Sequence, residues 1–254
     1  MTDDLLVDIH DGVMTLTINR PEQRNAMTLE VARGIARALD ELDARQDLRV
    51  GILTGANATF CAGMDLKRFA TGERPWIEGR GFGGLAERGP RKPLIAAVEG
   101  WALGGGFEMV LACDLVTAGK SANFGLPEVK RGLVARGGGM LRLPRRIPHA
   151  IAMEMLLTGE PVTALRAAKH GLVNAVTDDG GALPRAVELA RVIAENAPLA
   201  VQTAKAVATE SADWSLDEMF DRQQPLSDAV FASEDAREGV VAFSERRRPQ
   251  WRGV

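Results

Sequence analysis

Residues 93–128 read PLIAAVEGWALGGGFEMVLACDLVTAGKSANFGLPE, and this stretch decides the fold. Its opening run, residues 94–98, is short, apolar and β-rich, which is typical of a buried strand. Gly100 and the triple glycine 104–106 break the run, and residues 107–112 then predict a helix too apolar to face water. A strand, a glycine turn and a buried helix in this order leave backbone N–H groups at a positive helix end, which suits an anion or a developing oxyanion.

Glu108 lies in the first turn of this apolar helix. Burying a carboxylate is costly unless the group is paired or used, so its position has two interpretations. It is either a partner for the helix dipole beside a tightly packed glycine turn, or a residue that takes part in chemistry. The local pattern leaves both open.

A second junction of the same kind is TFCAGMDL, residues 59–66. Gly63 permits a close approach of another backbone segment, and Asp65 is a suitable N-cap for a helix that starts after it. Taken alone, the pattern also fits an ordinary capped turn.

The rest of the chain predicts an α/β body followed by a helical C-terminal third. Before the central stretch we expect a hairpin of strands 5–9 and 13–18 around Asp11-Gly12, a helix from Thr28 to about residue 44, and a strand at 50–54. After it we expect a glycine turn at 137–139, a strand at 172–176, and helices at 140–143, 151–157, 163–170, 183–195, 200–209, 216–231 and 235–246. Pro225 is expected to kink or split its helix, and Arg142, Arg145 and Arg146 to form a solvated face.

The composition changes between residues 71 and 92 to glycine, arginine and proline. Gly79, Gly81 and Gly84 satisfy the spacing of a dinucleotide fingerprint, but no strand precedes them and Gly89-Pro90 follows where a helix should run. We therefore expect a mobile loop at the mouth of a site.

The overall composition is that of a globular protein with a sizeable core. Of 254 residues, 46% are apolar and 26% charged, and the net charge of −3 gives no reason to expect nucleic acid or an anionic membrane as partner. Cys61 and Cys113 form no disulfide or metal pattern, which favours a reducing compartment. The acidic N-terminus predicts no signal or transit peptide, and no apolar run approaches a membrane span. We expect a soluble, cytoplasmic protein.

The absence of several motifs narrows the chemistry. There is no G-x-S-x-G elbow and no P-loop, and the three histidines are scattered without the spacing of metal ligands. Carboxylates and glycine-lined backbone donors remain. That combination suits carbonyl or thioester chemistry through an enolate, with proton transfer by glutamate.

The motifs FCAGMDL, IAAVEGWALGGGFEMVLACDL and FGLPEVKRGL together resemble the crotonase (enoyl-CoA hydratase/isomerase) superfamily. The similarity extends from TINRPEQRNAM to AFSERRRPQWRG, which is essentially the whole chain. The resemblance implies a spiral of ββα units over residues 1–195, with a thioester site, and a helical region over 196–254 used in trimerisation. It further implies a homo-hexamer built as a dimer of trimers, an acyl-CoA thioester as substrate with no separate cofactor or metal, and a role in fatty acid metabolism.

The resemblance also implies roles for particular residues. The N–H groups of Met64 and Gly105 would form an oxyanion hole for the thioester carbonyl. Glu108 would polarise the water that attacks Cβ, and Glu128 would supply the proton to Cα, although the sequence does not settle which carboxyl carries each proton. Two carboxyls so close should have pKa values pushed apart. The implied substrate-binding positions are Arg24, Ala26, Ala62, Asp65, Leu66, Gly104, Arg136, Phe243 and Arg246, the last pair reaching the nucleotide from a neighbouring subunit.

One departure from the family pattern concerns the water site. Relatives usually have a glycine eight residues after the second glutamate, and this chain has Arg136 there. Its backbone N–H can still serve, but its side chain reshapes the site. Trp76, Phe82 and Leu85 are candidates for lining the acyl pocket. Both glutamates favour a 2-enoyl-CoA hydratase. The alternatives are an isomerase that uses one glutamate, and a non-catalytic acyl-CoA-binding protein on the same scaffold. For Phe243 and Arg246, the alternative to coenzyme A binding is a core phenylalanine and a solvated basic tail.

Overall fold

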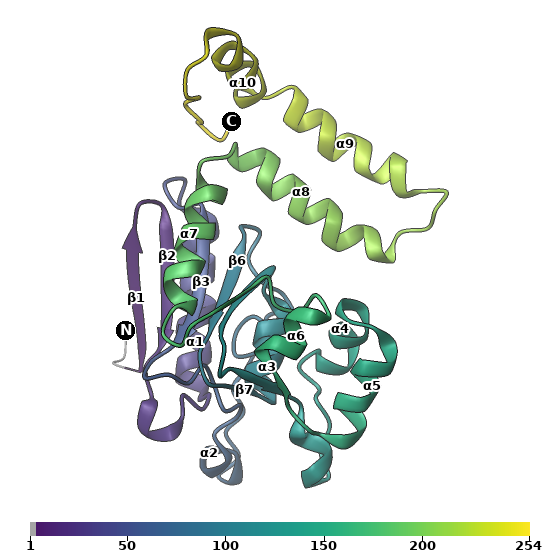
Figure 1. Cartoon of the computed structure of the whole chain (residues 1–254). Helices are drawn as coiled ribbons and strands as arrows, with labels where there is room; N and C mark the ends of the chain where they lie inside the picture. Colours follow the sequence, from purple (N-terminus) through teal and green to yellow (C-terminus); the bar gives the residue numbers. More distant parts are fainter. Residues whose placement is uncertain (1–3) are drawn as a thin grey trace.

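The computed structural model describes residues 4–254, which are built around a six-stranded sheet in the order β1-β2-β3-β6-β8-β11 (Figure 1). Strand β1 pairs antiparallel with β2, and every later pairing in the sheet is parallel. The strands are β1 (Leu5–His10), β2 (Val13–Ile18), β3 (Val50–Gly55), β6 (Leu94–Val98), β8 (Leu115–Gly119) and β11 (Ala175–Thr177). The α/β class predicted from the sequence is confirmed.

The hairpin between β1 and β2 has the expected turn. Asp11 and Gly12 have φ angles of 49° and 75°, which are the left-handed values that a tight two-residue hairpin requires. The register runs from Leu5 opposite Ile18 to His10 opposite Val13.

Helices cover both faces of the large sheet. On one side lies α1 (Leu29–Ala44), whose N-cap Thr28 accepts a hydrogen bond from the Val31 N–H at 3.3 Å. On the other side α7 (Ala182–Ala194) packs its buried alanines against strands β2, β3 and β6 (Figure 1). Ile52 and Leu53 are neighbours on β3 but belong to different hydrophobic clusters, because successive side chains of a strand point to opposite faces.

A smaller sheet in the order β10-β9-β7 completes the winding. Its strands are β7 (Trp101–Leu103), β9 (Asn123–Gly125) and β10 (Val162–Thr163). The chain passes from β6 through β7 into α3 (Gly105–Ala112), and a bridge between Cys61 and Ala102 gives the earlier pass from β3 to α2 (Leu66–Ala70) the same arrangement. This repeated strand, strand and helix is the ββα spiral that the resemblance implied.

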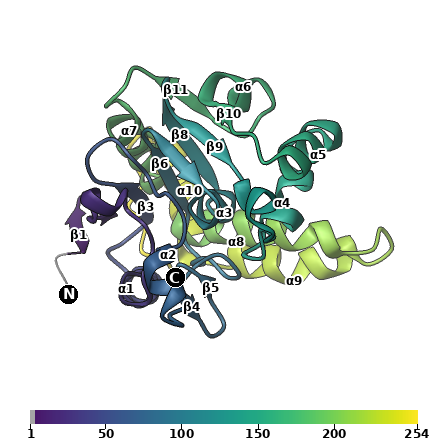
Figure 2. The same cartoon turned by 90° about the horizontal axis from the view of Figure 1, so that it is seen from below.

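Four further elements belong to the second half of the spiral. They are η2 (Pro127–Arg131), α4 (Gly139–Arg146), α5 (His149–Thr158) and α6 (Ala164–Lys169). Of these, α4 packs against α3 (Figure 2). The last strand of the large sheet, β11, begins later than the predicted run at 172–176, because Leu172 and Val173 are buried in the turn before it.

The segment 71–92 differs from the expected mobile loop. It forms a hairpin of β4 (Trp76–Ile77) and β5 (Gly81–Phe82), and Phe82, Leu85 and Ala86 are buried. Gly84 has a φ of 77°, and a Cβ there would lie 2.3 Å from the Ala32 carbonyl oxygen. The glycines therefore serve close packing against α1, which composition alone does not distinguish from flexibility.

The prediction of a solvated arginine face on α4 is wrong for two of three residues. Arg142 donates to the Ala86 carbonyl, and Arg146 donates to the carbonyls of Leu111 at 3.2 Å and Cys113 at 3.0 Å. Arg145 is exposed as expected and pairs with Asp213. The two partly buried guanidinium groups satisfy carbonyl oxygens at the end of α3 and in the 71–92 segment.

Three C-terminal helices extend from the body as an arm, with α8 and α9 side by side in both views (Figures 1 and 2). They are α8 (Pro198–Glu210), α9 (Met219–Phe231) and α10 (Glu234–Glu245). Pro225 lies inside α9, which is not split, so that half of the expectation is wrong and the alternative of a kink stays a prediction. No helix within residues 4–254 is long and apolar enough to cross a membrane.

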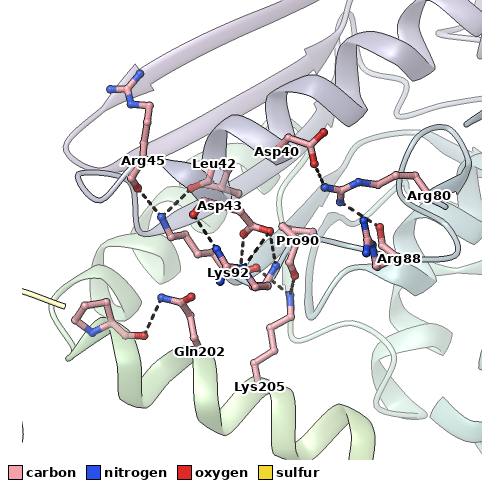
Figure 3. A network of polar contacts seen from close by, with 12 residues as sticks. Asp40, Leu42, Asp43, Arg45, Arg80, Arg88, Pro90, Lys92, Gln202 and Lys205 are labelled. Atoms are coloured by element: carbon pink, nitrogen blue, oxygen red, sulfur yellow. Dashed lines mark hydrogen bonds and ion pairs between the residues drawn. The ribbon is translucent and has the colours of Figure 1, made fainter. Parts of the chain in front are cut away.

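Lys205 fastens this arm to the body. Its Nζ donates to the carbonyls of Pro90 and Lys92, each at 2.9 Å (Figure 3). It also donates to Asp114 Oδ2 at 2.7 Å. Lys92 in turn donates from its Nζ to the Leu42 and Arg45 carbonyls at the end of α1. One chain of charge-assisted hydrogen bonds thus joins α8, the start of β6 and the end of α1.

We predict that Lys205→Met lowers the free energy of unfolding by about 1–3 kcal/mol, because the largely buried Asp114 carboxylate and two carbonyls lose a charged donor. Lys120→Met is the matched control, since Lys120 makes an exposed pair with Asp178 that should contribute less than about 1 kcal/mol. The measurement is urea unfolding at one protein concentration. Equal losses in the two variants would contradict the anchoring role.

Candidate active site

The two glycine junctions found in the sequence lie side by side. Cys61 N–H donates to the Trp101 carbonyl at 2.9 Å, and Leu103 N–H donates to the Cys61 carbonyl at 3.0 Å. Gly63 has a φ of 94°, and a Cβ there would lie 2.8 Å from the Leu103 carbonyl oxygen. These contacts bring the residues after Gly63 against the start of α3.

Met64 and Gly105 present the two backbone N–H groups expected for an oxyanion hole. Neither N–H donates to a protein acceptor within residues 4–254, and both residues line one cavity of about 510 Å³. Gly104 precedes the helix with φ 53° and ψ −127°, a conformation that requires glycine, and its own N–H is used by the Gly125 carbonyl at 2.9 Å. Two free donors, one of them at a helix N-terminus, can stabilise a developing negative charge.

Glu108 reaches this cavity from the first turn of α3. Only 3% of the residue is exposed, and Oε1 accepts a hydrogen bond from the Gly139 N–H at 2.9 Å. Burial raises the pKa of Glu108 to about 7, and the charge of Glu128 acts in the same direction, while the N–H groups of Gly139 and Gly137 oppose the rise. A carboxyl with a pKa near neutrality can both accept and release a proton at physiological pH.

Glu128 approaches the same cavity from η2. Its Oε1 lies 3.0 Å from the position that a Cβ on Gly104 would occupy. Its Oε2 is buried, and no donor among residues 4–254 reaches it. Burial raises the pKa of Glu128, and the nearby Arg131 charge opposes this effect. The two carboxyls therefore face one cavity beside the free N–H groups, which excludes the interpretation of Glu108 as a helix-dipole partner alone.

Most of the residues singled out in the sequence line this cavity. Those that do are Ala62, Met64, Leu66, Gly104, Gly105, Glu108, Glu128 and Arg136, together with the acyl-pocket candidates Trp76 and Phe82. Leu85 does not, because it is fully buried in the main core.

Three expected substrate-binding residues are not among those that line the cavity, namely Arg24, Ala26 and Asp65. Asp65 caps α2 and pairs with Arg20 at 3.1 Å, and Ala26 is buried, with its carbonyl accepting from Arg20. Arg24 is exposed, and its carbonyl accepts from the N–H of the cavity residue Ala62 at 3.0 Å.

One chain does not bring Phe243 or Arg246 to the cavity. Both belong to the arm, at α10 and its C-cap, and Phe243 is 88% exposed. A core role for Phe243 within one chain is therefore wrong.

Sequence reasoning missed part of the site. Five residues that were not singled out also line the cavity: Phe69, Arg74, Arg131, Leu133 and Val134. Two of them, Arg131 and Leu133, belong to the motif FGLPEVKRGL, but the motif does not mark their side chains as part of the site. It also missed the partner of Glu108, although the glycine turn at 137–139 was visible as a third junction. Among residues 4–254 no cluster of three or more histidine, cysteine, aspartate or glutamate side chains is arranged to hold a metal ion.

We predict that Glu108→Gln stabilises the protein increasingly as pH rises. The carboxyl has a pKa of about 7 when folded and 4.5 ordinarily, so the folded state keeps a proton that the unfolded state releases in this window. The contribution of this proton to the free energy of unfolding of the parent is fully present below pH 4.5, and it is lost as the pH rises through 7. Above this pH window, the free energy of unfolding of the variant should exceed that of the parent by roughly 3 kcal/mol.

The measurement is chemical unfolding of parent and variant across this pH range, at fixed protein concentration. Glu22→Gln, which removes a carboxylate from an exposed position on η1 (Pro21–Gln23), is the control and should give a flat difference. A flat difference for Glu108→Gln as well would show that its environment is not desolvated.

Comparisons with known proteins agree with this geometry. A family model described as enoyl-CoA hydratase/isomerase matches residues 8–254. Enoyl-CoA hydratase EchA19 of Mycobacterium tuberculosis is 42% identical, over 98% of this chain and 96% of that protein. Carnitinyl-CoA dehydratase of Salmonella arizonae is 40% identical, over 100% of both. The crystal structure of an enoyl-CoA hydratase from Mycobacterium tuberculosis H37Rv matches with a TM-score of 0.98 at 54% identity, covering 100% of both chains. This protein therefore belongs to the enoyl-CoA hydratase/isomerase family, the crotonase superfamily that its glycine junctions indicated.

Proposed function

We propose that the protein is a 2-enoyl-CoA hydratase, a hydro-lyase that adds water across the 2,3 double bond of an enoyl-CoA thioester. The observation that carries this proposal is the pair of carboxyls, Glu108 and Glu128, in one cavity with two unpaired backbone N–H groups. The names of relatives at 42% and 54% identity, both enoyl-CoA hydratases, support water addition.

In the proposed reaction the thioester carbonyl oxygen accepts hydrogen bonds from the N–H groups of Met64 and Gly105. Negative charge develops on this oxygen as C3 is attacked, and the fixed donors stabilise it. The water oxygen bonds to C3 while Glu108 takes a water proton, and Glu128 gives a proton to C2. The product has gained one water, and proton exchange between the two carboxyls restores the starting state.

Residues outside this centre are assigned to the coenzyme A moiety, which enters as part of the substrate. We assign its phosphates to Arg24 and, from a neighbouring copy of the chain, to Arg246, with Phe243 of that copy against the nucleotide. The proposal requires no separate cofactor or metal, and we assign the activity to fatty acid metabolism in the cytoplasm.

A double-bond isomerase is the second candidate, because Arg136 stands where the family pattern has a glycine at the water site. An isomerase would move a proton with one glutamate and would add no water. A non-catalytic acyl-CoA-binding protein would catalyse neither reaction.

We predict that Glu108→Gln and Glu128→Gln each lower hydration of a 2-enoyl-CoA by roughly 100- to 10,000-fold, since each removes a positioned acid or base. The double variant should lose far less than the product of the two, because the carboxyls act as a unit. The measurement is turnover in oxygen-18 water. We expect the parent to place oxygen-18 at C3 of the product and both variants to lose this labelling. Double-bond migration without incorporation of label, retained after one of the two substitutions, would contradict the hydratase.

We further propose that the chain assembles as a hexamer, a dimer of trimers, through the helical region 196–254. The arm carries Phe220, Phe231 and Val240, which are 73%, 81% and 72% exposed, and several large apolar side chains exposed on one segment are typical of an interface. Phe243 on the same arm is the residue that the proposed site borrows from a neighbour.

We predict a hexamer by light scattering, and smaller species for Phe231→Asp with the fold retained, because a buried interface charge is strongly unfavourable. Leu6→Asp is the control, since Leu6 is 49% exposed on strand β1 rather than on the arm. A monomer at micromolar concentration of the parent would reject the assembly.

A further inference from the structure

The side chain of Arg136 lines the cavity and carries a positive charge that the proposed reaction does not use. The Arg136 guanidinium carbon lies 4.8 Å from the centroid of the Trp76 ring, and both residues line the cavity. Within residues 4–254 this guanidinium donates no hydrogen bond and makes no ion pair. Stacking on an aromatic face fixes the planar group while leaving its N–H donors free for a ligand.

The other two arginines that line the cavity donate hydrogen bonds to backbone carbonyls. Arg131 donates to the Pro127 carbonyl at 3.3 Å, and Arg74 donates to the carbonyls of Phe69 and Glu73, each at 2.9 Å. Neither Glu108 nor Glu128 pairs with Arg136 in the described part of the chain, so its charge is not neutralised there. Arg136 is exposed at the lining of the cavity, and a cation without a counter-charge at such a position favours an anionic ligand group.

The position of Arg136 indicates which part of the substrate it meets. At the reacting end, a Cβ on Gly105 would lie 2.3 Å from the Phe82 ring. Phe82 pairs with Trp76 across the β4–β5 hairpin, and Trp76 carries Arg136. The sequence of neighbours therefore runs from the oxyanion donor Gly105 to Phe82, then to its strand partner Trp76, and then to the Arg136 guanidinium.

The neighbouring residue places Arg136 on the acyl side of the carboxyls. Arg136 directly precedes Gly137, and a Cβ on Gly137 would lie 2.6 Å from Glu108 Oε2. With the thioester at Gly105 and C3 between the two carboxyls, the acyl chain continues past Glu108 toward Trp76 and Arg136.

Resting on the proposed thioester chemistry, we infer that Arg136, held against Trp76, is a specificity-determining residue that binds a carboxylate on the acyl tail. The substrate class is then 2-enoyl-CoA thioesters whose acyl chain ends in a carboxylate. A planar guanidinium matches a carboxylate with two parallel hydrogen bonds, so the preference depends on arginine geometry as well as charge. The phosphates of coenzyme A are the other anions that such a group could meet, and the test separates the two.

The experiment compares a 2-enoyl-CoA that carries a terminal carboxylate with a neutral 2-enoyl-CoA of the same chain length. For the carboxylated substrate, Arg136→Gln should lower kcat/KM by about 10- to 100-fold, the worth of a charge-assisted hydrogen bond. The neutral substrate should lose less than this, so that the ratio of kcat/KM for the carboxylated over the neutral substrate falls, because only the carboxylated tail meets the guanidinium. Arg136→Lys should recover only part of the preference, since lysine keeps the charge but not the planar fork.

Arg145→Gln is the matched control. Arg145 is an exposed arginine of α4 that pairs with Asp213, and its removal changes the net charge equally without touching the cavity. It should leave the ratio of the two substrates unchanged.

A parallel binding measurement by calorimetry uses the corresponding saturated acyl-CoAs, which cannot be hydrated. Selective loss of affinity for the carboxylated compound in Arg136→Gln supports the inference even if no enoyl-CoA is hydrated, and in that case only the proposed hydratase fails. Equal losses for both compounds would assign Arg136 to the coenzyme A phosphates and overturn the inference. Unchanged affinity and unchanged kcat/KM for both would overturn it as well.

Discussion

The close approach of two backbone segments is the constraint on which the site depends. A Cβ on Gly106 would lie 2.3 Å from the Cys61 carbonyl oxygen, and one on Gly63 would lie 2.8 Å from that of Leu103. No side chain fits at either position, so the end of one turn of the spiral lies directly against the start of the next. Because of this contact, N–H groups about forty residues apart in the chain face the same cavity, and neither depends on a side chain for its position.

The two carboxyls, unlike the backbone N–H groups, depend on their side chains, and they lie where a negative charge is unfavourable. Glu108 is almost fully buried, and its raised pKa measures how much the interior disfavours the ionised form. The Gly139 N–H offsets part of this penalty, while Glu128 Oε2 has no partner within residues 4–254. The site is therefore a locally unfavourable region supported by the cores on both faces of the sheet. Such arrangements are typical of positions selected for chemistry rather than for stability.

The sequence predicted the parts of this structure that depend on local rules. Alternating apolar residues, the Asp11-Gly12 turn and the Thr28 cap predicted strands and helices within a few residues of their bounds. The glycine pattern marked both junctions, because glycine is required where backbone approaches backbone, and the family resemblance assigned the donors to Met64 and Gly105. By contrast, the three-residue strands β7 and β9 exist through pairing with each other, and so carry no periodicity of their own.

The parts that sequence reasoning missed depend on tertiary contacts. The 71–92 segment packs closely because α1 lies against Gly84. Arg142 is partly buried because the Ala86 carbonyl of the same segment accepts its hydrogen bond. The partner of Glu108 comes from a turn about thirty residues further along the chain, and nothing in either local pattern links the two. The division at residues 195 and 196 stays a prediction, although the arm begins close to it at α8.

Arg136 shows how the reacting centre and the substrate pocket are separated in this fold. A glycine is required where φ is positive or where a Cβ would collide, and Arg136 is not among the residues with positive φ. Its backbone therefore accepts a side chain without strain, and the N–H groups of Gly137 and Gly139 still oppose the raised pKa of Glu108. The side chain is carried away from that carboxyl and onto Trp76. The substitution consequently changes the lining of the cavity without disturbing the backbone donors, which is how one catalytic frame can accommodate different acyl groups.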